Sequence, residues 1–128
     1  MAAPRSRWRR RCLFVLALLL AYPVLVVGAT YAITLRSGLP GGSHGPCDAY
    51  RHSLASALVA YTLSPRCVLW VTDLMERGDD ASHRMDAHNN QVGVRLAREA
   101  TSLADLLARV RKAVDRGHEI SPPSLADR

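Results

Sequence analysis

Three short stretches of the chain concentrate side chains that could do chemistry. They are residues 48–52 (DAYRH), 73–76 (DLME) and 85–93 (MDAHNNQVG). Carboxylate, imidazole and carboxamide groups are costly to bury unless they are paired or bind a metal. Where several converge, they form either a hydrogen-bonded network or a metal or acid–base site. These residue types suit hydrolysis of a phosphodiester, a lipid or an envelope ester, because a metal ion or a His–carboxylate pair can activate water.

The candidate site residues fall into two groups. Four are candidates for catalysis: His52, Glu76, Asp86 and His88. Three are candidates for binding: Arg51, Asn89 and Asn90. In this interpretation His52 is a base or metal ligand, while Glu76 and Asp86 are ligands or orienting carboxylates. These residue types do not identify a cofactor, although a divalent metal is compatible with them.

The same residues also have a structural interpretation. Asp48 at a helix start could cap the helix or interact with its dipole, and Asn89 could hydrogen-bond a neighbouring helix. In that alternative the chain is a non-catalytic envelope interaction protein, and the polar cluster stabilises its fold. Convergence of the side chains of His52, Glu76 and Asp86 within about 6 Å, the range of strong charge coupling, beside an open pocket would favour the site. Dispersed side chains, or a sealed cluster without a pocket, would favour the structural interpretation.

The elements that must position these residues are helices. Apolar residues at helical spacing predict four of them, over residues 48–62, 67–77, 84–100 and 102–117. The second also suits a strand because it is rich in β-branched residues, and residues 79–83 are expected to form a loop. Together with the apolar N-terminal segment, the pattern predicts an all-α fold, in which a transmembrane helix precedes a small bundle of about four helices.

Two positions in the third predicted helix point toward the core. At 100° per residue, Asn89 and Gly93 fall inside its apolar stripe. Glycine inside a helix costs about 1 kcal/mol relative to alanine. Close approach of another backbone is one physical reason for Gly93.

An uninterrupted apolar run marks a membrane segment. Residues 12–35 contain no Asp, Glu, Lys, Arg or His, and as a helix they would span roughly 36 Å, more than the ~30 Å hydrocarbon core. Arg9, Arg10 and Arg11 precede the run, so the positive-inside rule places the N-terminus in the cytoplasm. A cleavable signal peptide is the alternative, because the small residues at 27–29 suit a cleavage site.

The net charge of +6 belongs mainly to the N-terminus. Five arginines in residues 1–11 contribute +5, which leaves +1 for the rest of the chain. The expected partners are therefore the lipid bilayer, through residues 12–35, and an envelope protein; no nucleic acid is expected.

These observations predict a single-pass protein of the cell inner membrane with a periplasmic or extracellular domain. The expected segments are a basic cytoplasmic tail (1–11), a transmembrane anchor or signal peptide (12–35), a flexible linker (36–46), an exported helical domain (47–117) and a loosely ordered tail (118–128). Cys47 and Cys67 flank the first predicted helix, whose length of roughly 22 Å disfavours a disulfide between them.

The motifs resemble an uncharacterised bacterial helical domain family. Its members carry a DAxRH stretch, a later His-Glu pair and an MDxHNNxxG stretch, which correspond here to residues 48–52, Glu76 and residues 85–93. Met75 replaces the histidine of the pair. The family occurs in short exported proteins and at the ends of secreted toxin-like proteins, so the resemblance implies an exported helical domain with a shared site at these residues.

Overall fold

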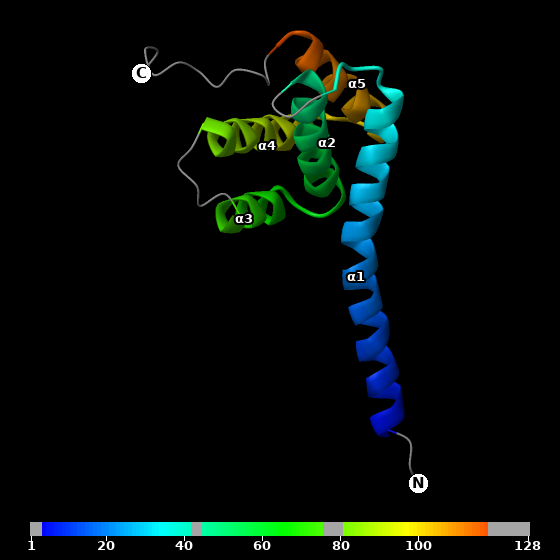
Figure 1. The fold of residues 1–128 in the computed structure, drawn as a ribbon. Helices are drawn as coiled ribbons and strands as arrows, with labels where there is room; N and C mark the ends of the chain where they lie inside the picture. Colours follow the sequence, from blue (N-terminus) through cyan, green and yellow to red (C-terminus); the bar gives the residue numbers. More distant parts are fainter. Residues whose placement is uncertain (1–3, 42–44, 76–80, 118–128) are drawn as a thin grey trace.

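The computed structural model describes residues 4–41, 45–75 and 81–117, and within them it contains helices and no strand. The helices are α1 (Pro4–Arg36), α2 (Pro46–Thr62), α3 (Pro65–Met75), α4 (Ala81–Glu99) and α5 (Leu103–Asp115). A long apolar N-terminal helix thus precedes a bundle of four shorter ones (Figure 1). The expected all-α fold is confirmed.

Two helices of the bundle begin at prolines, earlier than their apolar periods predict. Pro46 and Pro65 each occupy the first helical residue, where the missing N–H costs nothing and the fixed φ angle favours the helix. The segment that also suited a strand is α3, a helix. The expectation of a loop at 79–83 is wrong for residues 81–83, which form the first turn of α4.

The last helix begins as expected. The side chain of Ser102 accepts a hydrogen bond from the backbone N–H of Asp105 at 3.1 Å, which caps α5. At the other end Gly117 has φ +72°, the left-handed conformation that commonly terminates a helix.

α2 is the central helix of the bundle, because it packs against α1, α3, α4 and α5. Leu54 and Ala57 of α2 and Leu106 and Val110 of α5 are completely buried. This position agrees with the nearly all-round apolar surface of α2, which is typical of a helix surrounded by others.

α1 has two distinct parts. Its C-terminal part lies beside α2, where Thr30 and Thr34 are buried and Val26 and Ile33 pack against the core (Figure 1). Its N-terminal part projects away from the domain, and Leu19 there is 65% exposed. The helix is long and apolar enough to cross a membrane, although a signal sequence can share these properties.

Candidate functional site

The site forms where α2 and α4 cross. A Cβ atom on Gly93 would overlap the backbone carbonyl oxygen of Ser53 and lie 3.0 Å from the backbone nitrogen of Ala57. The two backbones therefore meet at Gly93, as its place in the apolar stripe predicts. Ser53 Oγ also donates a hydrogen bond to the Asn89 carbonyl oxygen at 3.1 Å, which fixes α2 against α4.

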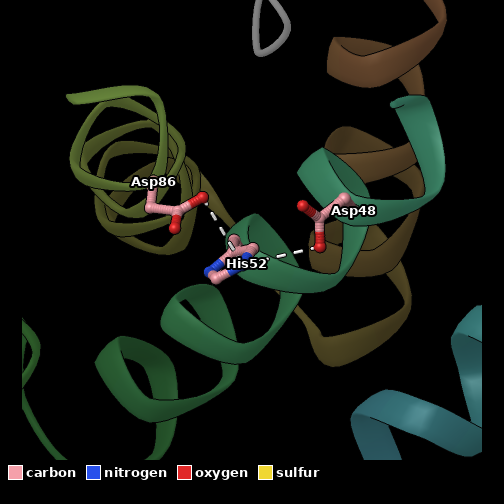
Figure 2. Close-up of side chains that lie close together, drawn as sticks. All are labelled: Asp48, His52 and Asp86. Atoms are coloured by element: carbon pink, nitrogen blue, oxygen red, sulfur yellow. Dashed lines mark ion pairs between the residues drawn. The ribbon is translucent and has the colours of Figure 1, made fainter. Parts of the chain in front are cut away.

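Three acidic and imidazole side chains converge at this crossing (Figure 2). Asp48 and His52 lie one turn apart on α2, and Asp86 faces them from the beginning of α4. The Nε2 atom of His52 is 3.6 Å from Asp48 Oδ1 and 3.5 Å from Asp86 Oδ1. One potential ligand atom from each residue lies within 4.8 Å of the other two. We call these three residues the Asp–His–Asp cluster.

The cluster combines burial with access. Asp48 is only 6% exposed, whereas the side chains of His52 and Asp86 are 34% and 26% exposed. The cluster thus meets the solvent through His52 and part of Asp86, while Asp48 and the Oδ1 atom of Asp86 form its buried side.

Arg51 contributes a positive charge beside the cluster. Its Nη2 atom forms an ion pair with Asp48 Oδ1, and its guanidinium carbon lies 5.5 Å from the centre of the Tyr31 ring on α1. Two carboxylates and one guanidinium give a net charge of −1 when His52 is neutral.

The geometry fits a divalent cation. Asp86 Oδ1 is buried and has no hydrogen-bond partner among the described residues. His52 Nε2 is the ion-pair partner of this oxygen at 3.5 Å, and a metal ion held by both atoms would compensate its burial. Ligand atoms around a tetrahedral metal at about 2.0 Å lie about 3.3 Å apart, close to the separations of His52 Nε2 from the two carboxylates.

The other predicted site residues take different positions. Asn90 Oδ1 accepts a hydrogen bond from Ser56 Oγ at 2.6 Å. Asn89 is completely buried, and its side-chain amide has no hydrogen-bond partner within the described part of the chain. His88 is two residues from Asp86, about 200° around α4, and is not part of the Asp–His–Asp cluster. Glu76 lies outside the described residues.

Asp48 belongs to one of the three stretches that could do chemistry, and two structural roles were also open for it: a helix cap or a favourable charge near the helix N-terminus. It lies in the first turn of α2, as the second role requires, but the cap of α2 is Gly45, without a side-chain hydrogen bond. Its spacing of four residues from His52 is the signal that could have placed it in the site, because such residues lie on the same side of a helix.

These features define a small all-helical domain with an N-terminal apolar helix and a His/Asp cluster. The chain belongs to the family described as a domain of unknown function (DUF6973), whose model matches residues 12–118. The match includes the whole Asp–His–Asp cluster and agrees with the expectation of an uncharacterised domain family. Comparisons with curated proteins and with solved structures find no match.

Proposed function

We propose that this protein is a membrane-anchored hydrolase whose extracytoplasmic domain binds a divalent metal ion at Asp48, His52 and Asp86. The observation that supports the proposal is the convergence of three potential ligand atoms within 4.8 Å. The ligands come from two of the three stretches that resemble the bacterial family, residues 48–52 and residues 85–93. Glu76, from the third stretch, is a candidate further ligand.

The proposed location is the cell inner membrane, with α1 as a single span. Arginines 9–11 precede the apolar run, and Arg36 ends it, so the charge asymmetry supports a cytoplasmic N-terminus. The exported domain then comprises α2 to α5, after a linker of residues 37–45 that is shorter by one residue at each end than the sequence suggested, and the bilayer is its first partner.

The proposed substrates are phosphodiesters or envelope esters. A divalent ion in the cluster would lower the pKa of a bound water and polarise the substrate. Arg51 supports an anionic substrate, because its side chain is 34% exposed beside the cluster and guanidinium groups bind phosphate and carboxylate oxygens in pairs. Its ion pair with Asp48 holds that carboxylate in place.

A second candidate function is a non-catalytic envelope interaction protein in which the cluster is structural. Two observations favour it. Arg51 already pairs with Asp48, and the Ser53–Asn89 and Ser56–Asn90 hydrogen bonds join α2 to α4. In this case the polar groups specify how the helices pack, and an envelope protein would bind the surface.

Metal content separates the two candidates. We expect full-length protein, purified in detergent without chelators, to contain about one divalent ion per chain by elemental analysis. The variants His52→Ala and Asp86→Asn are expected to lose at least about 10-fold in affinity, the range seen when ligands or their supporting groups are changed.

The matched control is His88→Ala, which also removes a histidine. His88 lies on a different side of α4 from Asp86, outside the cluster. This variant is expected to keep the ion, and circular dichroism would show that all variants remain helical. Wild-type protein without metal, or equal metal in all variants, would contradict the metal site and leave the structural cluster as the better explanation.

A further inference from the structure

Large exposed apolar side chains lie within ten residues of one another outside α1. They lie at the end of α2 and on α3: Tyr61, Leu63, Leu69 and Trp70, which are 40–68% exposed. We call them the α2–α3 corner. In the rest of the described bundle, only Leu103 on α5 is comparably apolar and exposed. Trp70, at 68%, is the most exposed of the four, a costly arrangement for its large ring in water.

Contacts with α1 fix the height of this corner along the membrane helix. Tyr22 and Thr62 are joined by a hydrogen bond of 2.5 Å between their hydroxyl oxygens, and Arg51 lies over the ring of Tyr31. α1 and α2 therefore run in opposite directions, with the end of α2 beside the middle of α1 (Figure 1). α3 follows at the edge of the domain nearest the free part of α1.

The same contact explains a polar group in the middle of the apolar run. Thr62 Oγ1 donates its hydrogen to the Leu58 carbonyl oxygen at 2.7 Å, so the Tyr22 hydroxyl is the donor to Thr62. An unpaired hydroxyl among acyl chains would be unfavourable. The Tyr22–Thr62 hydrogen bond therefore suits surroundings without water.

The position of Tyr22 along α1 gives the depth of the Tyr22–Thr62 contact in the membrane. It follows Cys12, the first residue of the apolar run, by ten residues, or about 15 Å of helix. That is half of the ~30 Å hydrocarbon core. If α1 spans the bilayer, the end of α2 and the corner beside it lie within the outer half of the membrane.

From these observations we infer that the α2–α3 corner is seated in the outer leaflet, with the acyl chains of phospholipids as its partner. The end of α2 lies against the middle of α1, so that in this arrangement the domain rests in the membrane instead of being suspended on the linker. The inference rests on the proposed transmembrane orientation of α1.

This position of the corner in the outer leaflet also determines how far the proposed site lies from the centre of the bilayer. His52 precedes Thr62 by ten residues, so it lies about 15 Å farther along α2 toward the outside. The Asp–His–Asp cluster then lies at the level of the phospholipid headgroups. Membrane phosphodiesters are therefore the substrate class nearest to the proposed site.

Tryptophan fluorescence tests the seat, because the chain has two tryptophans. The Trp8→Phe variant of the full-length protein leaves Trp70 as the reporter. In phosphatidylcholine vesicles, we expect blue-shifted emission that brominated acyl chains quench at least about 2-fold and that aqueous iodide leaves unchanged.

The control places a tryptophan at Leu103 after both natural ones are changed to phenylalanine. Since α5 makes no contact with α3 among the described residues, this reporter is expected to respond to iodide.

The outcomes separate the seat from the other proposals. Protein that stays with the vesicles after alkaline extraction, but whose Trp70 is quenched by iodide, would overturn the seat and leave the anchor intact. Protein released by alkali would overturn both. Quenching of Trp70 by brominated lipid in the His52→Ala variant as well is expected, because the seat does not depend on the metal site.

Discussion

Gly93 sets how closely the two helices that carry the Asp–His–Asp cluster approach each other. Any side chain there would overlap the Ser53 carbonyl oxygen of α2. The end of a flexible side chain could rotate away from such an overlap, whereas a carbonyl oxygen of the helix backbone cannot. The distance between His52 on α2 and Asp86 on α4 therefore depends on a residue that carries no chemistry itself.

The Gly93→Ala substitution tests this dependence. Overpacking a close contact typically costs about 1–3 kcal/mol, and the rigid neighbour places this case at or above the upper end. Alanine recovers about 1 kcal/mol in helix propensity. We expect a net loss of about 2 kcal/mol in the free energy of unfolding, together with weaker metal binding, measured by urea denaturation and elemental analysis.

Gly28→Ala is the matched control, because a Cβ atom at Gly28 meets nothing within 4 Å. It is expected to leave metal binding unchanged and not to lower the free energy of unfolding, because alanine adds up to about 1 kcal/mol of helix propensity there without a clash. Equal stability of the two variants would show that α2 and α4 do not meet at Gly93.

At the scale of elements, α5 depends on a network at its first turn. The backbone N–H of Thr101 donates to Asp105 Oδ2 at 2.9 Å, and Arg109 Nε donates to the same oxygen at 2.9 Å. The Thr101 hydrogen bond, followed by the Arg109 interaction, lowers the pKa of Asp105 below its usual 3.8. Because ionised Asp105 is favoured in the folded state, it stabilises α5.

The lowered pKa of Asp105 makes the stability of the protein depend on pH. Stabilisation by Asp105 is fully present above pH 3.8 and is lost as the pH falls through the lower folded-state pKa. We expect the urea midpoints of wild type and Asp105→Asn to differ at neutral pH and to converge in strong acid. Ser102→Ala, which removes the cap without removing a titratable group, is expected to cost about 1 kcal/mol at every pH. A constant difference for Asp105→Asn would contradict the lowered pKa.

Elements of this kind were predictable from local sequence. Ser102 and Asp105 mark the start of α5, and the apolar periods of the chain identify its helices, because capping and amphipathicity act within a few residues. The starts at Pro46 and Pro65 were placed two residues late, since apolar periodicity says nothing about the first turn. Local sequence could not decide between a helix and a strand for α3, because that choice depends on tertiary contacts.

The site was only partly predictable. Arg51, His52 and Asp86 stand out by type, but the pairing of α2 with α4 depends on tertiary packing that no local spacing contains. For that reason His88 looked equivalent to Asp86, although it lies elsewhere around α4. Asp48 was not singled out as a site residue, because a cap or a favourable charge at the helix start could also account for an aspartate there.

At the scale of the whole molecule, α1 is both a membrane-length helix and a part of the domain. Thr30 and Thr34 are buried against the bundle, and Arg111 Nη1 donates to the Ser37 carbonyl oxygen at 2.5 Å, which ties α5 to the end of α1. The bundle is thus held against its anchor by direct packing. In the proposed arrangement this packing determines how far the Asp–His–Asp cluster lies from the lipid.

The most direct test is the melting temperature of chelator-treated full-length protein as Zn²⁺ or Mn²⁺ is added. An ion at 100 times its dissociation constant stabilises the folded state by about 2.7 kcal/mol, which for a domain of this size corresponds to a rise of roughly 10 °C or more. We expect that rise in the wild type and none in Asp86→Ala. An unchanged melting temperature in the wild type, or the same rise in both proteins, would contradict a metal site at Asp48, His52 and Asp86.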